Sequence, residues 1–254
     1  MISIFSDNAD SLYRKVLKKI MEDGQVTYPR GFCCLELTPC NISLLYADCN
    51  IISNPLRKIN KGFAAAEMMW ILEGRDDVAY LDPYNSKIKA YSDDGVKFFG
   101  AYGPKFKGQM DYVISTLMED PWSRQAVINI WRENPPKTKD VPCTIMFQFI
   151  RRPVDRLNLV VYMRSQDCWL GLPYDLHNFT CFQIIVANLL GIKPGKFDLI
   201  QGSLHAYESD WDKINKLCSG PLPATVTTTP TDTNMLLLQK KLWMKEYLDS
   251  KLRM

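Results

Sequence analysis

The sequence predicts a single domain of the mixed α/β (α+β) class, and three observations support that class. The 254 residues are 46% hydrophobic, which is enough apolar material for one large core, although two smaller domains also fit this length. Runs typical of β-strands interchange with runs that have helical spacing. One long apolar run, residues 173–190, is typical of a helix buried in the middle of a domain.

The first half of the chain predicts two helices around a pair of strands. Apolar residues recur at helical spacing between Asn8 and Asp23, and Gly24 ends that helix. A strand pair is expected over residues 31–52, and a compact apolar helix over residues 62–74. Residues 76–103 are rich in turn formers, and an irregular segment of that length is usually functional or disordered.

The second half predicts a helix over residues 107–119 and then three strands, at residues 124–131, 143–151 and 157–164. The long apolar helix at residues 173–190 follows, closed by Gly191. A short helix is expected after Tyr207. Residues 219–234 have the Ser/Pro/Thr composition of a linker, and a final amphipathic helix is expected over residues 235–252.

Charge and cysteine content exclude several classes of function. The formal charge of +3 is too small and too dispersed to indicate nucleic-acid binding. No apolar run reaches the roughly 18 residues of a membrane span, and the N-terminus lacks the apolar core of a signal peptide. The eight cysteines are scattered without zinc-site spacing, so we expect reduced thiols, a cytoplasmic protein and no metal.

Cys143 is the candidate nucleophile, because Pro142 places it at the entrance of a predicted strand, where a thiol can face a cleft. The alternative is a buried small hydrophobe. No partner base follows at protease-like spacing, so nearby cations would have to favour the thiolate. Four arginines are candidates for that role and for binding a phosphate, unless they are only solvated charges: Arg30, Arg124, Arg151 and Arg164.

Glu67 and Tyr102 are the candidate proton-handling groups. Glu67 is the one acid in an apolar helix, where burial would raise its pKa towards neutrality; the alternative is a surface glutamate. Tyr102 stands between Gly100 and Gly103, which would allow a ligand to approach closely, unless this tyrosine only packs on a turn.

Six ordered motifs, AEMMWILEG, FGAYGP, DPWSRQAVI, VPCTIMFQF, RSQDCWLGLPYD and GSLHAYE, resemble the thymidylate synthase superfamily, which includes the cytidylate hydroxymethylases. The similarity covers residues 30–207. It implies a twisted mixed sheet packed on a long central helix, in a single domain that dimerises through its sheet. Residues 1–218 would then be the catalytic domain, and residues 219–254 a linker and helix packed on it.

The resemblance also implies a role for each matching residue. Cys143 would add to C6 of a pyrimidine nucleotide, so that C5 attacks the one-carbon unit of 5,10-methylenetetrahydrofolate, while Glu67 and Tyr102 manage protons. The nucleotide would be held by Arg30, Arg164, Ser165, Asp175, His205 and Tyr207, with Arg124 contributed by the other subunit of a homodimer. The folate would be held by Asp167, Leu170, Gly171, Tyr174 and Lys89.

Asp175 is expected to select the base. Uracil-specific members of the superfamily carry asparagine at this position, and its amide satisfies O4 and N3–H. A carboxylate accepts from the N4 amine of cytosine and, if it carries or shares a proton, also serves N3. Asp175 therefore favours cytidylate, unless it is merely the N-cap of the helix after Pro173.

Three residues depart from the pattern of the methyl-forming members. Lys89 stands where methyl-forming members have a tryptophan that shields an intermediate from water, which favours hydroxymethyl transfer. Gln125 replaces a phosphate-binding arginine, and Thr144 resembles the phage deoxycytidylate enzymes. The leading hypothesis is therefore a dCMP 5-hydroxymethyltransferase. The alternatives are a CMP hydroxymethylase of an antibiotic pathway, a methyl-forming dCMP or dUMP synthase, and a silent nucleotide- or RNA-binding relative.

Overall fold

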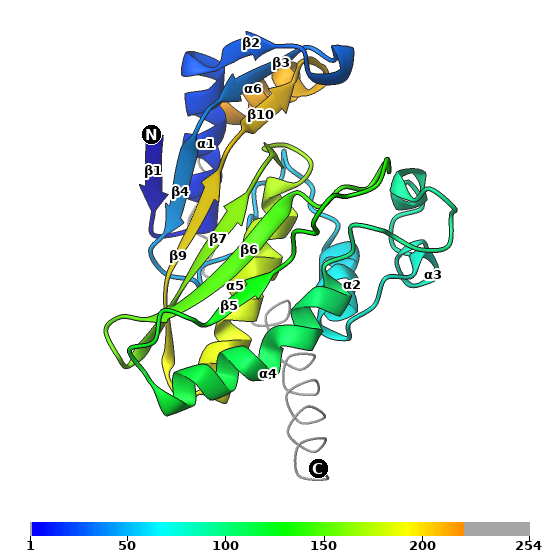
Figure 1. Cartoon of the computed structure of the whole chain (residues 1–254). Helices are drawn as coiled ribbons and strands as arrows, with labels where there is room; N and C mark the ends of the chain where they lie inside the picture. The colour runs from blue at the N-terminus through cyan, green and yellow to red at the C-terminus, as the bar shows by residue number, and fades with distance from the viewer. Residues whose placement is uncertain (1, 221–254) are drawn as a thin grey trace.

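The computed structural model describes residues 2–220 and confirms a mixed α/β domain built on two sheets. The larger sheet has six strands in the order β1-β4-β9-β7-β6-β5 (Figure 1). Two of its pairings, β1 with β4 and β7 with β9, are parallel, and the other three are antiparallel. The bounds of its strands are β1 Ile2–Ser6, β4 Cys40–Leu44, β5 Val127–Asn129, β6 Thr144–Arg151, β7 Arg156–Met163 and β9 Lys193–Gln201.

The smaller sheet has four short strands in the order β2-β3-β10-β8 and lies above the larger one in Figure 1. Its strands are β2 Gln25–Thr27, β3 Cys34–Leu37, β8 Gln166–Asp167 and β10 Leu204–Tyr207. The chain passes directly from a strand of one sheet to a strand of the other three times, from β3 to β4, from β7 to β8 and from β9 to β10. Only two residues separate the strands at each of these crossings. Side chains at these crossings therefore meet where the two sheets join.

Helices cover one face of the larger sheet. The helical segments are α1 Ala9–Asp23, α2 Lys61–Leu72, α3 Val78–Leu81, α4 Gly103–Glu119, α5 Leu172–Leu189 and α6 Trp211–Ser219, with shorter turns at Pro29–Gly31, Ile88–Tyr91 and Glu208–Asp210. The long helix α5 packs on β7 and β9, and the opposite face of the sheet is turned to the viewer in Figure 1. Within residues 2–220, no helix has the length and apolar character of a bilayer-spanning segment.

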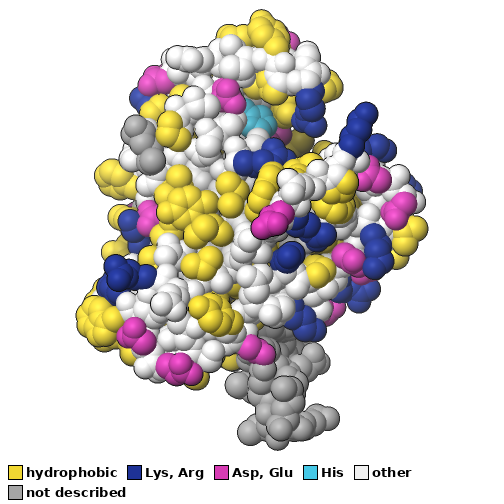
Figure 2. Space-filling view, viewed as in Figure 1, with side chains coloured by type: hydrophobic (Ala, Val, Ile, Leu, Met, Phe, Trp, Pro, Cys, Tyr) yellow, Lys and Arg dark blue, Asp and Glu magenta, His cyan; other side chains and the backbone are white. Residues whose placement is uncertain are grey.

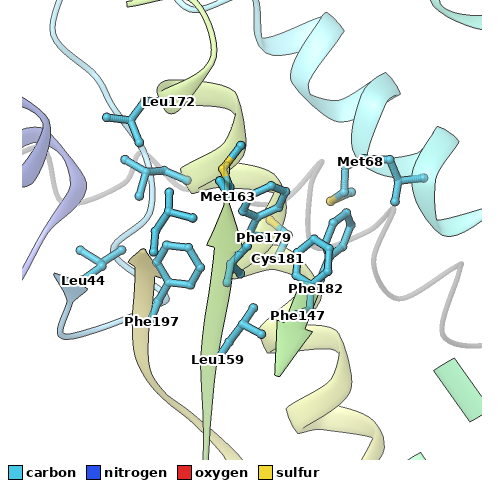
Figure 3. Packing of buried hydrophobic residues seen from close by; sticks show 14 of the residues in the cluster. Leu44, Met68, Phe147, Leu159, Met163, Leu172, Phe179, Cys181, Phe182 and Phe197 are labelled. Carbon is cyan, nitrogen blue, oxygen red and sulfur yellow. The ribbon is translucent and has the colours of Figure 1, made fainter. Parts of the chain in front are cut away.

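The core lies between α5 and the sheet and is rich in aromatic side chains (Figure 3). Phe147 of β6 meets Phe179 of α5 edge-on, with ring centroids 5.0 Å apart, and Phe106 of α4 lies 4.5 Å from Phe182. All four rings are fully buried. Pairs of this kind add about 0.5–1.5 kcal/mol each beyond the burial of their area. This packing fixes α5 on the sheet and so fixes the side chains at its N-terminal end.

Several predicted elements need correction. Residues 31–52 do contain two strands, β3 and β4, but these are not paired; they lie in different sheets, joined by a bend at Pro39. The predicted strand at residues 124–131 is ordered as strand only over Val127–Asn129, and the segment 76–103 contains α3 and a short turn of helix. Strands β1, β2, β8, β9 and β10 are additional. The predicted linker and final helix fall almost entirely outside the described residues.

Candidate active site

The site lies where the chain crosses from the larger sheet to the smaller one. At the end of β7, the backbone N–H of Arg164 donates to the carbonyl of Cys143 at 2.9 Å, so the two residues are held side by side. The N–H of Gly202 donates to the carbonyl of Met163 at 2.9 Å. A Cβ at Gly202 would lie only 3.1 Å from the carbonyl oxygen of Arg164, so glycine permits this close approach.

The Cys143 thiol lies against the guanidinium of Arg164, with Nη2 3.6 Å from Sγ. The same guanidinium donates to the carbonyls of Val141 and Pro142, each at 2.9 Å, and so clamps the segment that carries the thiol. Burial raises the pKa of Cys143, and the cations Arg164 and Arg30 oppose that rise. The expectation that cations would favour the thiolate is therefore met only in part, because burial dominates in the free protein.

Tyr102 approaches the nucleophile from a separate loop. Its hydroxyl accepts a hydrogen bond from the backbone N–H of Thr144 at 3.2 Å. Burial raises the pKa of the phenol, and the Cys143 and Asp175 charges raise it further, so the phenol stays protonated. The loop is anchored by Asp140, whose Oδ2 accepts from the N–H of Gly100 at 2.7 Å. Two hydrogen bonds between a side chain and a backbone N–H thus join the Tyr102 loop to the segment that carries Cys143.

Glu67 points from α2 to the N-terminal end of α5. Its Oε2 accepts from Nδ2 of Asn178 at 2.8 Å, so Glu67 is not a solvated surface glutamate. Burial, with a contribution from the charge of Asp175, raises the pKa of Glu67 to about 8. A carboxyl with that pKa can both hold and release a proton near neutral pH. The predicted rise in pKa is confirmed, while its catalytic role stays a prediction.

Asp175 lies in the first turn of α5, and it is not the N-cap. The cap residue is Gly171, and the Asp175 N–H donates to the Gly171 carbonyl at 3.1 Å. The carboxylate instead accepts from Nε2 of Gln166 at 2.9 Å through Oδ2. Burial raises the pKa of Asp175 to about 7, against the lowering effect of Gln166. Asp175 is therefore not a helix cap. It is an acid in the site that can gain or lose its proton near neutral pH.

The opposite wall of the site comes from β10 and the turn that holds Arg30. Arg30 has a left-handed backbone, with φ 55°, and its Nη2 donates to the hydroxyl of Tyr207 at 3.2 Å. The His205 ring meets that of Tyr207 edge-on at 5.1 Å, and burial lowers the pKa of His205, so this imidazole is neutral near pH 7. Figure 2 shows a histidine and several Lys or Arg side chains around a hollow beside the smaller sheet.

Most of the residues predicted to hold folate surround the turn before α5. Asp167 Oδ1 accepts from the N–H groups of Trp169 and Leu170, at 2.8 Å and 2.9 Å, which leaves its second oxygen for another donor. Burial raises the pKa of Asp167. The hydroxyl of Tyr174 accepts from the N–H of Asn60 at 3.1 Å. An acid with one oxygen still available fits a ligand that presents N–H donors.

Four predicted residues behave differently. The expectation that Arg151 binds phosphate in the site is wrong. Its side chain donates to the carbonyls of Leu117 and Val154 at the far end of β6. Arg124 is exposed at the edge of the larger sheet. Lys89 is also exposed and lies 4.0 Å from Asp82. Ser165 is half-buried at the crossing from β7 to β8, next to Arg164.

Gln166, Asn178 and Asp140 belong to the site but are absent from the predicted set. Asn178 lies three residues after Asp175, hence on the same face of α5, and a polar residue in so apolar a run was a usable signal. Gln166 lies inside the motif RSQDCWLGLPYD, between Ser165 and Asp167, but no role was expected for it. Nothing in the sequence indicated that Asp140 would reach Gly100.

The family model described as thymidylate synthase matches residues 11–235. The deoxyuridylate hydroxymethyltransferase of Bacillus phage SP01 is 32% identical over 241 aligned residues, covering 83% of this chain and 60% of that protein. A protein of the same name from Pseudomonas phage M6 is 28% identical over 235 residues, covering 87% of this chain and 65% of that protein. The chain thus spans less than two thirds of these relatives.

Proposed function

Because the chain belongs to the thymidylate synthase family, we propose that it transfers a one-carbon unit to C5 of a pyrimidine deoxynucleotide and forms a 5-hydroxymethyl product, with dCMP as the preferred substrate. The observation that carries the choice of base is Asp175: a half-buried acid beside Glu67 and Tyr102, where an amide would read uracil. A carboxylate accepts from the cytosine amine, and its protonated form also donates to N3.

The residues of the site suit the first step, the addition of sulfur to C6. Arg164 lies against Cys143 and stabilises the thiolate as the proton leaves. As the S–C6 bond forms, electrons of the C5–C6 double bond move towards C5, and a proton from Asp175 to N3 would relieve the charge that develops on the ring. C5 thereby becomes the carbon nucleophile.

Later steps need proton transfer at C5 and delivery of the one-carbon unit. Glu67, with a pKa of about 8, can take the C5 proton through water, and the protonated phenol of Tyr102 can orient that water. Family members use methylenetetrahydrofolate as cosubstrate, and it would supply a carbon at the oxidation level of formaldehyde. Asp167, Leu170, Gly171 and Tyr174 would hold it, since the second oxygen of Asp167 is available to N–H donors.

Water, and not hydride, is the proposed final nucleophile. Lys89 is exposed and offers no aromatic shield, although no contact in the described chain joins it to the site. Both relatives are named hydroxymethyltransferases, which supports the same product. Elimination of tetrahydrofolate from the transferred carbon would leave a methylene group on C5. Addition of water to that group and elimination of Cys143 from C6 would then release 5-hydroxymethyl-dCMP.

A second candidate substrate is dUMP, because both relatives are named for deoxyuridylate. Asp175 excludes uracil only when its side chain is ionised. With a pKa of about 7, the side chain is partly protonated near neutrality, and a carboxylic acid can donate to O4 and accept from N3–H. The two substrates thus differ in the arrangement of one proton.

We also propose a homodimer formed through the uncovered face of the larger sheet, in which Arg124 reaches the phosphate site of the partner. Met146, Tyr162 and Ile200 form a half-buried row across that face, and Figure 2 shows hydrophobic side chains gathered there. The eight cysteines, all within residues 2–220, form no disulfide with one another, and we propose a reducing compartment such as the cytoplasm.

The test is a product analysis with dCMP, dUMP and CMP, each with methylenetetrahydrofolate. We expect a mass increase of one hydroxymethyl group, fastest with dCMP, and no dihydrofolate. Formation of dihydrofolate would identify a methyl-forming enzyme. Faster turnover of dUMP would transfer the proposal to the second candidate, and a Cys143→Ala variant that stays active would disprove the nucleophile.

A further inference from the structure

The side-chain amide of Gln166 is hydrogen-bonded to Asp175 and held in one orientation. Its side chain is buried, with 2% of its surface exposed. The Nε2 group donates to Oδ2 of Asp175 at 2.9 Å and lies 3.4 Å from the carbonyl oxygen of Asp167. Both neighbours are acceptors, so a flipped amide would place its oxygen against two other oxygens. The donor side of Gln166 is therefore held towards Asp175.

Gly171 provides the room for this contact. A Cβ at Gly171 would lie 2.8 Å from Nε2 of Gln166 but 3.5 Å from Oδ2 of Asp175. The backbone of Gly171 is right-handed helical, so alanine is compatible with its conformation. A methyl group here would displace the amide and leave the carboxylate nearly in place. The absence of a side chain at position 171 thus has a specific structural consequence.

A carboxyl group with one proton can pair with either pyrimidine. Uracil requires a donor opposite O4 and an acceptor opposite N3–H, whereas cytosine requires an acceptor opposite N4 and a donor opposite N3. The two patterns differ only in which oxygen carries the proton. An unconstrained acid could move its proton to suit either base. An N–H that points at Oδ2 disfavours a proton there and leaves Oδ1 as the protonated oxygen.

We propose that Gln166 is a specificity-determining positioning residue, which keeps Oδ2 of Asp175 as an acceptor and so allows the carboxyl to read only one base. The inference rests on the proposed function. For cytosine, Oδ2 faces the N4 amine and Oδ1 faces N3. Uracil would then place O4 against an acceptor and N3–H against a donor, and two mismatched buried contacts lower turnover.

The test compares kcat/KM for dCMP and dUMP in the full-length protein. The Gln166→Met variant keeps the length of the side chain and removes both donors. We expect the kcat/KM for dCMP divided by that for dUMP to fall at least about tenfold. That factor corresponds to the loss of roughly one charge-assisted hydrogen bond. The folate is common to both assays, so a general loss of folding or folate binding cancels in the ratio. The basic limb of the dCMP pH profile should also move to higher pH, because the N–H no longer stabilises the carboxylate and the protonated form, which donates to N3, then persists to higher pH.

Gly171→Ala is the second variant, and it keeps Gln166 chemically intact. We expect the same fall in the ratio, because the methyl group displaces the amide.

The proposal is overturned if Gln166→Met and Gly171→Ala both keep the parental ratio and pH profile. Failure of the proposed function has a different signature: a parent that turns over neither nucleotide, or that prefers dUMP. In the latter case, a ratio that narrows in Gln166→Met still supports the role of Gln166, with the opposite oxygen facing position 4 of the base.

Discussion

Two half-buried acids, Glu67 and Asp175, lie close enough that the charge of Asp175 raises the pKa of Glu67. The pKa values of about 8 and about 7 both lie far above those of exposed carboxyls. Their hydrogen bonds from Asn178 and Gln166 offset only part of the burial. At least one of the two carboxyl groups therefore carries a proton near neutral pH. The proposed reaction needs such a proton, because the pyrimidine ring gains a proton and its C5 carbon loses one.

Replacement of Asp175 by asparagine should reverse the choice of base. The amide satisfies O4 and N3–H of uracil and mismatches cytosine, so we expect the dUMP/dCMP ratio of kcat/KM to rise about tenfold to a hundredfold. Steady-state kinetics with both nucleotides measure this ratio. Asp212→Asn, an exposed change on α6, is the control and should leave the ratio unchanged. An unaltered ratio in Asp175→Asn would show that the acid does not contact the base.

Glu67 should make the protein less stable as the pH rises. Its pKa is about 8 in the folded protein and near 4.5 when exposed, so between these values the folded state binds more protons than the unfolded state. The free energy of unfolding then falls as pH rises from about 4.5 to about 8. Glu67→Gln removes this term, so the difference in Tm between pH 5 and pH 8 should shrink by about a few degrees.

Thermal unfolding at several pH values measures the effect of Glu67→Gln. Glu22→Gln is the matched control, because Glu22 is on the surface of α1, where its side chain is 54% exposed, and should leave the pH dependence of Tm unchanged. Equal slopes for the parent and Glu67→Gln would mean that Glu67 is ionised in the folded protein.

At the scale of elements, the approach of the 98–103 loop to the nucleophile depends on the lack of a side chain at Gly100. A Cβ there would lie 2.5 Å from the carbonyl oxygen of Asp140, which is backbone and cannot move alone. Gly100→Ala should separate the Tyr102 loop from the Cys143 segment and lower kcat by about tenfold or more. Gly108→Ala, where nothing lies within 4 Å of the added methyl, should instead raise stability by about 0.5–1 kcal/mol.

Activity and Tm of the two alanine variants, measured together, separate the site from the scaffold. If Gly100→Ala retains parental kcat, then the loop does not need its contact with Asp140 to place Tyr102.

The long helices were predictable because their signals are local. Periodic apolar residues and a terminal glycine locate α1 and α5 to within one or two residues. Short strands such as β8, with two residues, carry almost no pattern, and their existence depends on distant partners. The same distinction holds in the site. The motifs named Cys143 and Arg164, which the structure places side by side, whereas Gln166 and Asp140 enter through contacts that sequence spacing does not encode.

At the scale of the whole molecule, sheet membership was the feature that sequence could not provide. β3 and β4 are consecutive, so a hairpin was the natural expectation, but the chain bends at Pro39 and each strand joins a different sheet. The other two direct crossings between the sheets bring the site residues together, since Arg164 lies between β7 and β8 and His205 lies on β10, just after the crossing from β9. Local pattern predicted the class of fold, and non-local pairing determined where the chemistry lies.

The uncovered face of the larger sheet supports the last prediction. Rows of side chains alternate across β6, β7 and β9: Phe147, Val161 and Leu199 are fully buried under the helices, and the next row is only half-buried. A half-buried apolar row on a sheet is typical of a surface that a second copy covers. Arg124 lies exposed at the edge of that sheet.

If Arg124 acts in the partner's site, two inactive variants should restore each other. Cys143→Ala lacks the nucleophile but retains Arg124, and Arg124→Ala retains the nucleophile. In a mixed dimer, one of the two sites has both groups intact. Free exchange of subunits gives half mixed dimers, so activity should recover to about a quarter of the parental value. Assay of dCMP turnover before and after mixing measures this recovery, and each variant mixed with itself is the control. Recovery only to the average of the two separate activities would place Arg124 in its own subunit's site, or outside the site altogether.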